Sequence, residues 1–294
     1  MLHAGDLPTN TLYQYATQTR SSGYLWQAIR AYRELVGLVD PDDPLALAQV
    51  LWELGSACLD FDQPQTAIAV LERAREAAHA ARLPVRETEC LTGLGQACRQ
   101  TQKLALSLSY CQQAHSLFSD LEPDAALARL WIQQGLTHAQ SGAFAEAQVD
   151  YTQALSVAKT ITDQLLQVEA LRYLGNLCAV DLGERERGIG YLEEALVLLR
   201  AREELSTRTI ATTVVRTLAE LSNLKMQRKE TIGEVFDLLV DAQRQAPLTG
   251  DPALTAHISY LMDAATLMLG KYTHQSPTTA ADKTGDDDLA FYEE

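Results

Sequence analysis

The sequence of 294 residues contains few residues of the kinds that interrupt helices, with 9 prolines and 16 glycines. No apolar stretch reaches the roughly 18 residues that a membrane-spanning helix needs, so direct membrane insertion is not expected. Residues 1–11 lack the basic and apolar blocks of a signal peptide, and long alternating apolar and polar runs typical of strands are missing. Together these absences favour an all-α protein in the cytoplasm.

Basic residues are also scarce, since 24 Lys+Arg stand against 39 Asp+Glu, which gives a formal net charge of −15. Binding to nucleic acid depends on clustered lysine and arginine that release counterions, and binding to an anionic membrane surface depends on similar clusters. Neither is therefore an expected partner. The five cysteines form no Cys-x-x-Cys pair and have no Cys/His ligand spacing, which argues against zinc and against a disulfide framework.

Sequence motifs of catalysis are missing too. The chain has no dinucleotide-binding glycine motif, phosphate loop, Gly-x-Ser-x-Gly or His-Glu-x-x-His. The segment nearest to a glycine-rich loop runs from Gly183 to Gly190, and the four charged residues between Gly183 and Gly188 argue against phosphate binding. We interpret it as a hairpin turn with one inserted residue. The sequence therefore predicts a non-catalytic protein without a cofactor, and an enzyme is the last of the alternatives.

What the sequence does contain is a repeat. Four glycines lie 40 residues apart inside helix-like stretches: Gly55, Gly95, Gly135 and Gly175. A glycine inside a helix is less favourable than alanine by roughly 1 kcal/mol, so we expect a neighbouring helix to cross each glycine too closely for a side chain. Three residues later stand Cys58, Cys98, His138 and Cys178. At one phase of a repeat, these cysteines are expected to be small packing residues.

A second helix follows each glycine. Its small residues are Ala67, Ser107, Ala147 and Gly188, its larger residues four positions on are Leu71, Cys111, Tyr151 and Leu192, and a further small position holds Ala74, Ala114, Ala154 and Ala195. Small and large positions at this spacing lie on one stripe of a helix. Each unit of 40 residues is therefore predicted to be a helical hairpin.

This pattern resembles the tetratricopeptide repeat (TPR) family, whose unit has a Leu-Gly pair in its first helix and small, large and small positions in its second. The units here are longer than the usual 34 residues and are similar to those of kinesin light chains and of Rap-type peptide-sensing regulators. The resemblance implies an all-α, right-handed superhelical solenoid of antiparallel hairpins. We expect the solenoid over residues 1–272, divided into a degenerate unit (10–40), clear units (about 44–204), a degenerate unit (206–246) and a capping helix (251–271).

The prolines agree with this division, because they are expected where helices are joined: Pro41, Pro44, Pro64, Pro84, Pro123, Pro247 and Pro252. Asp251 and Pro252 are expected at the N-cap and in the first turn of the last helix. That helix is apolar on more than one side, so we expect it either to pack deeply against the preceding hairpin, which we favour, or to form a dimer or partner surface.

The TPR resemblance implies that the first helices line a concave groove. Residues three and two positions before and one after each glycine should then face a partner: Trp52, Glu53, Ser56; Thr92, Gly93, Gln96; Ile132, Gln133, Leu136; Arg172, Tyr173, Asn176. Arg129 and Glu169 lie one turn earlier in the third and fourth units. Trp52 and Tyr173 are expected either to anchor a partner or to pack between hairpins, while Trp26 and Trp131 are expected in the core.

Some TPR proteins hold the C-terminal carboxylate of a chaperone with lysine, asparagine and arginine side chains. Arg172 and Asn176 resemble one such pair in spacing, and Arg129 stands at another basic position. However, Gly93 stands where the clamp would need asparagine, and Gln133 stands where it would need a second basic residue. A groove for an extended or helical segment with apolar anchors is therefore the better interpretation.

Residues 273–294 are predicted to form a flexible acidic tail, because their sequence is polar and has no periodicity. Leu289, Phe291 and Tyr292 stand among its acids and resemble a short docking motif. The tail is interpreted as a docking motif, as an autoinhibitory segment that folds back over Arg129 and Arg172 and competes with a partner, or as a solubilising end.

The leading function is an adaptor or assembly scaffold that holds a partner protein or peptide in the groove. The alternative is a regulator whose curvature changes when a peptide binds.

Overall fold

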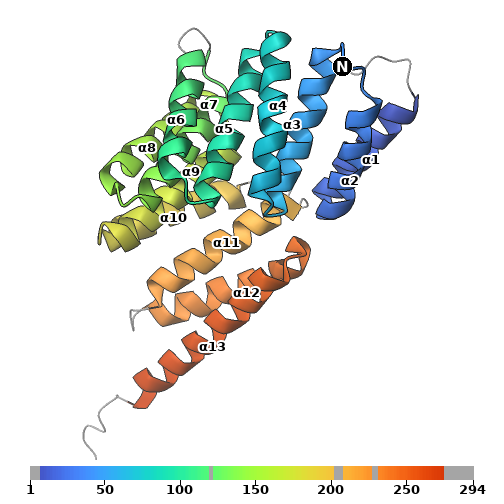
Figure 1. Ribbon diagram of the computed structural model, residues 1–294. Coiled ribbons are helices and arrows are strands. Elements are labelled where there is room, and N and C mark those ends of the chain that lie inside the picture. Colours follow the sequence, from blue (N-terminus) through green and yellow to red (C-terminus); the bar gives the residue numbers. More distant parts are fainter. Residues whose placement is uncertain (1–6, 119–121, 202–207, 227–230, 275–294) are drawn as a thin grey trace, which may run out of the picture.

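The computed structural model describes residues 7–118, 122–201, 208–226 and 231–274, and the regular elements within these ranges are helical (Figure 1). In chain order they are α1 (Leu7–Ser21), α2 (Leu25–Leu38), α3 (Pro44–Asp60), α4 (Pro64–Ala80), α5 (Pro84–Gln100), α6 (Leu104–Leu117), α7 (Ala125–Gln140), α8 (Phe144–Thr160), α9 (Gln164–Asn176), the π-helix η1 (Leu177–Asp181), α10 (Arg185–Arg200), α11 (Arg208–Lys225), α12 (Ile232–Thr249) and α13 (Pro252–His274). The predicted all-α solenoid of antiparallel hairpins is confirmed.

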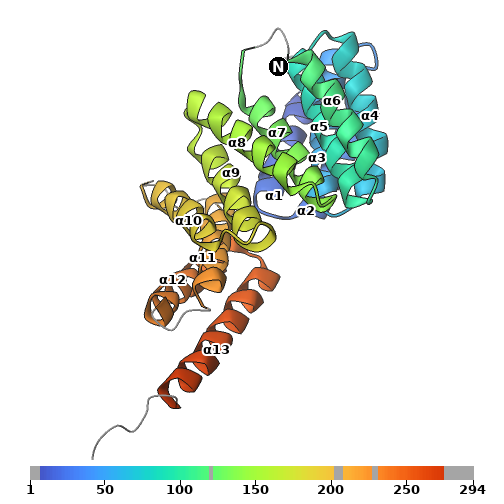
Figure 2. The same ribbon diagram turned by 90° about the vertical axis from the view of Figure 1, so that its left-hand side faces the viewer.

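Each odd-numbered helix from α1 to α11 pairs with the helix that follows it, and α13 packs on α11 and α12. The first helices of adjacent hairpins also contact one another: α3 meets α5, α5 meets α7, and α7 meets α9. The second helices of those hairpins contact one another less, so the first helices form the inner side of the curve. In both views α11 to α13 lie below the stack formed by α1 to α10 (Figure 2).

Helix starts follow from local chemistry. Proline occupies the first turn of α3, α4 and α5, where its missing N–H costs nothing. Asp124 caps α7, with its Oδ1 accepting from Ala126 N at 2.9 Å and Leu127 N at 3.1 Å. Asp251 caps α13 in the same way, through Ala253 N at 3.0 Å and Leu254 N at 3.2 Å, which confirms the predicted N-cap.

Pro247 departs from the expected pattern. It lies inside α12, which continues to Thr249, whereas the sequence placed it at a joint after Ala246. The helix ends instead at Gly250, which adopts the left-handed conformation with φ 59°, a common helix stop.

The repeat glycines lie against the second helix of their own hairpin. A Cβ atom on Gly135 would lie 2.5 Å from the Tyr151 ring, and one on Gly55 would lie 2.5 Å from Leu71. At Gly175 the nearest atom would be Leu192 Cγ at 2.9 Å. The predicted close crossing is confirmed at these three positions. It is wrong at Gly95, where a Cβ would make ordinary contacts at 3.5 Å, because the opposing residue is the smaller Cys111.

The fourth clear unit contains the inserted residue. Gly188 follows Gly175 by thirteen positions, whereas Ala147 follows Gly135 by twelve. The sequence placed the extra residue in the turn, but the structure accommodates it in the π-helix Leu177–Asp181 at the end of α9. A π turn holds one more residue than an α turn, so the following turn and Gly188 keep their place in the repeat.

The last helix is amphipathic. Leu254, Ile258, Leu261 and Ala265 are buried against the preceding hairpin, while Tyr260 is 67% exposed and Leu267 is 70% exposed. One face of α13 therefore caps the solenoid and the opposite face presents apolar groups to solvent.

Candidate binding groove

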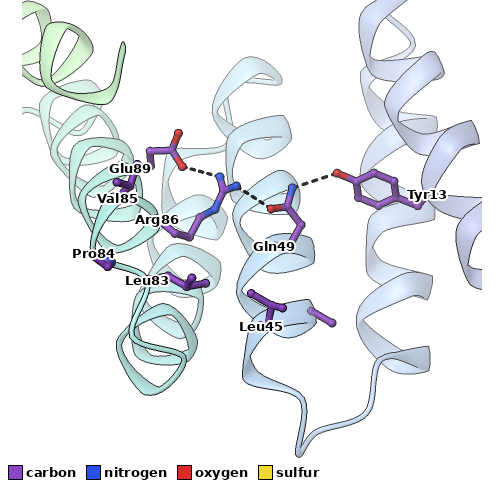
Figure 3. A pocket seen from close by; sticks show the side chains of 9 residues that line it. Tyr13, Leu45, Gln49, Leu83, Pro84, Val85, Arg86 and Glu89 are labelled. Atoms are coloured by element: carbon purple, nitrogen blue, oxygen red, sulfur yellow. Dashed lines mark hydrogen bonds and ion pairs between the residues drawn. The ribbon is translucent and has the colours of Figure 1, made fainter. Parts of the chain in front are cut away.

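The N-terminal part of the concave face contains a hydrogen-bonded row of side chains from three first helices (Figure 3). Gln49 of α3 donates from Nε2 to the Tyr13 hydroxyl of α1 at 3.1 Å, and its Oε1 accepts from Arg86 Nη2 of α5 at 2.7 Å. Arg86 also donates to Glu89 Oε2 at 2.5 Å. The row links α1, α3 and α5 across the inner surface.

This row borders a pocket of about 590 Å³. Leu45, Leu83, Pro84 and Val85 supply its apolar wall. Leu45 is 45% exposed and Val85 is 38% exposed, so the wall is open to solvent. A pocket of this size, with an apolar wall and a few fixed polar groups, has room for one or more apolar side chains of a partner.

Trp52 and Glu53 lie close to the row. The Arg86 guanidinium stacks over the Trp52 ring at 4.3 Å from its centroid, so Trp52 is partly covered. Glu53 accepts from Arg20 Nη1 at 2.8 Å and from the Tyr13 hydroxyl at 3.2 Å. Burial raises the pKa of Tyr13, and the Glu53 carboxylate raises it further.

The centre of the groove is a charged strip. Arg129 of α7 is exposed and interacts electrostatically with Glu89 of α5 and Glu169 of α9. Burial raises the pKa of both carboxyls, although nearby arginines act in the opposite direction: Arg86 and Arg129 on Glu89, and Arg172 and Arg129 on Glu169. Arg129 has no hydrogen-bond acceptor among the described residues, so its guanidinium is open to a partner.

Arg172 has a different environment from Arg129. It is 9% exposed and donates twice to Glu220 of α11, from Nε at 2.9 Å and from Nη2 at 2.5 Å. Such a bidentate pair satisfies both groups. Asn176, its proposed companion in a clamp, is only partly buried, so the two residues of the predicted pair differ in their access to a partner.

Other predicted groove residues pack between first helices. Ile132 is 5% exposed and Gln133 is 4% exposed, which leaves them little surface for a partner. Leu136, Gln96 and Tyr173 are partly buried. The Tyr173 ring stacks on Tyr151 of α8, with centroids 5.4 Å apart and planes 19° apart.

The two tryptophans predicted in the core differ. Trp26 is 55% exposed, so the core assignment was wrong; it lies in the first hairpin beside Leu12 and Tyr15. Trp131 packs partly against the core and contacts His115 at 4.1 Å between ring centroids. The tail residues Leu289, Phe291 and Tyr292 lie outside the described residues.

Comparisons with known proteins agree with this architecture. A sequence profile of the tetratricopeptide repeat matches residues 128–160, the hairpin of α7 and α8. The chain thus contains a tetratricopeptide repeat. Among curated proteins, none matches the sequence.

Solved structures match the fold over most of the chain. A Rap protein complexed with competence and sporulation factor has a TM-score of 0.65 at 15% identity, covering 92% of this chain and 78% of its own. The Rap conjugation gene regulator of plasmid pLS20, in complex with the Phr* peptide, has a TM-score of 0.60 at 13% identity, covering 96% and 81%. TPR-like kinesin light chain repeats from Podosopora anserina have a TM-score of 0.51 at 15% identity, covering 69% and 100%. At these identities the likeness shows the fold.

The TPR frame also locates groove residues that the sequence interpretation missed. Arg129 and Glu169 stand six positions before their glycines, and the same offset in the first two units gives Gln49 and Glu89. Applying the offset to every unit would have found both. Tyr13, three positions before Ala16, holds the place that Trp52 holds before Gly55.

The part of the chain that the structure describes contains no candidate metal site, because no group of three or more histidine, cysteine or acidic residues there could hold a metal ion. All five cysteines are free and buried, as expected for packing residues, and burial raises the pKa of Cys90 and of Cys111 to about 12. None of the described helices is long and apolar enough to span a membrane.

Proposed function

We propose that this TPR-type protein is a non-catalytic cytoplasmic adaptor that binds a segment of a partner protein along its concave groove. The observation that carries the proposal is a set of polar side chains at the same position of four successive first helices, Gln49, Glu89, Arg129 and Glu169, with an apolar pocket at its N-terminal end. An extended segment would satisfy its backbone groups on these four side chains and place one side chain in the pocket.

The spacing of the helices suits such a segment. Packed helices lie about 8–10 Å apart, and an extended chain advances about 3.3 Å per residue. A bound strand would therefore meet a new first helix at about every third residue. The contacts that we assign to it are these four polar side chains, the partly buried Tyr173 and Asn176, and the wall formed by Leu45 and Val85.

Partner selection from a peptide display library, followed by fluorescence polarisation, tests this proposal. We expect Arg129→Glu to weaken a selected peptide at least about tenfold, because the reversed charge removes the open donor and repels the partner, a change of roughly 1.4 kcal/mol. The matched control is Arg73→Glu, a reversal on the exposed side of α4. Equal effects of the two reversals would contradict the groove assignment.

A second candidate function is peptide-responsive regulation. One Rap structure that shares this fold is in complex with the Phr* peptide, and another is complexed with competence and sporulation factor. In this chain a long-range contact joins α11 to the turn after α1. A peptide that changed the curvature would have to strain or release that contact. Small-angle scattering with and without a selected peptide separates the candidates, since a regulator changes its radius of gyration and an adaptor keeps it.

A further inference from the structure

Arg99 is a groove arginine with an unusual set of partners. It lies in the last turn of α5, four residues after Gly95, and is half-buried. Its Nη1 donates to Gln140 Oε1 of α7 at 3.5 Å. With the Gln133 amide oxygen turned toward α5, that oxygen accepts from Arg99 Nε at 3.3 Å. Both partners are neutral amides at long distances.

Three other groove arginines form ion pairs with carboxylates, and Arg129 interacts electrostatically with Glu89 and Glu169. Arg20 pairs with Glu53 and Asp60, Arg86 with Glu89, and Arg172 with Glu220. For Arg99, no carboxylate lies within ion-pair distance among the described residues. Burial lowers the pKa of Arg99, against the opposing effect of the Tyr173 and Tyr151 hydroxyls.

The guanidinium also keeps free hydrogen-bonding capacity. It carries five N–H donors in a planar fork, and in the described ranges only Nε and Nη1 have acceptors. A carboxylate can accept two parallel hydrogen bonds from such a fork. The stacked rings of Tyr173 and Tyr151 interact electrostatically with it, so a bound carboxylate would lie beside an aromatic wall.

We propose that Arg99 is a carboxylate-binding subsite of the groove, and that the partner segment supplies its missing counter-charge. The inference rests on the proposed function, because it takes the occupant to be a protein segment. The carboxylate is either the C-terminus of the segment or an aspartate or glutamate side chain. Arg99 stands four positions after Gly95, three beyond the last offset at which the sequence analysis placed groove residues. The proposed subsite includes neither Arg172 nor Asn176.

A double-mutant cycle with a library-selected peptide tests the subsite. We expect replacement of the recognised carboxylate by an amide to weaken binding at least about tenfold in the wild-type protein, and to have little effect in Arg99→Gln. Amidation of the peptide C-terminus and Glu→Gln or Asp→Asn changes within the peptide distinguish the two sources of the carboxylate. Arg99→Lys, which keeps the charge but loses the fork, should recover only part of the affinity.

The outcomes separate the two proposals. If the peptide is lost in Arg129→Glu but binds equally to Arg99→Gln and to wild type, the subsite is overturned and the groove function stands. If no peptide binds in the groove, the proposed groove function is wrong. Binding of a carboxylate to Arg99 is then tested separately, with acetate as the probe.

The acetate measurement uses nuclear magnetic resonance of the arginine Nε–Hε signals, with sodium chloride at matched ionic strength. The Arg99 signal, assigned with Arg99→Lys, should shift along a saturable curve. Arg30 is the control, because it is exposed and already paired with Glu34 at 3.1 Å. Shifts of Arg99 no larger than those of Arg30 would overturn the subsite. Circular dichroism of each variant verifies that the helices are intact.

Discussion

Arg208 donates from Nη1 to the carbonyl oxygen of Ser22 at 2.7 Å, across 186 positions of the sequence. Its Nη2 donates to the Gly250 carbonyl oxygen at 3.2 Å. Both acceptors follow the C-terminal ends of helices, α1 and α12, where carbonyl groups have no partner within the helix and carry partial negative charge. One guanidinium thus joins the first hairpin to the last, and the turn at Gly23 has no room for a Cβ atom beside it.

The first prediction concerns this contact. Arg208→Ala should lower the free energy of unfolding by about 1–2 kcal/mol, because two charge-assisted hydrogen bonds are lost, and should increase the radius of gyration measured by small-angle scattering. Arg30→Ala, which removes an exposed pair within α2, should change neither quantity appreciably. An unchanged scattering profile for Arg208→Ala would mean that the contact does not hold the two ends together.

The second prediction separates two repeat glycines. Gly135→Ala should lower the free energy of unfolding by about 1–3 kcal/mol, since its Cβ would overlap the buried Tyr151 ring. Gly95→Ala should be neutral or raise it by up to about 1 kcal/mol, since the site has room and alanine is the better helix former. Chemical denaturation of both variants provides the comparison, and equal losses would contradict the packing described for Gly95.

The third prediction concerns pH. Because the pKa of Glu169 is raised in the folded protein above its ordinary value of 4.5, its contribution to stability is complete below that value and is lost as pH rises through the folded pKa. Glu169→Gln should therefore be more stable than wild type at pH 7, and the difference should disappear near pH 4. Denaturation series at several pH values measure it, with exposed Glu76→Gln as control. A difference that grew toward acid pH would show that the sign is wrong.

Much of the fold could be predicted from the sequence because each unit of the repeat packs its two helices in the same way. Gly55, Gly135 and Gly175 mark helix crossings that each hairpin must reproduce, and small residues such as Ala67 and Ala147 confirm the phase. Local exceptions were beyond that reasoning. The π-helix near Leu177 is one of several ways to absorb an extra residue, and the space at Gly95 depends on Cys111 from another helix.

The site could be predicted only in part, because an offset from a glycine indicates a direction and not a partner. The position of Arg172 suggests an open groove residue, but Glu220, 48 positions away, pairs with it. Arg99 is the opposite case, because its sequence position gave no sign of a groove site. Only the arrangement of α5, α7 and α9 in the structure shows that no carboxylate pairs with it among the described residues. Interactions between repeats, and between the two ends of the solenoid, carry no signature within one repeat.

The most direct measurement is the location of a bound segment. A photoreactive residue would replace Gln49, Arg129 or Asn176 in the groove. In control proteins it would replace Arg73 on α4 or Val149 on α8. Crosslinks to a selected peptide would be mapped by mass spectrometry. We predict crosslinks from the three groove positions only, at peptide sites that follow the order of the helices, with about three residues between neighbouring first helices. Crosslinks from Arg73 or Val149, or groove crosslinks without that order, would contradict the binding of an extended segment along the concave face.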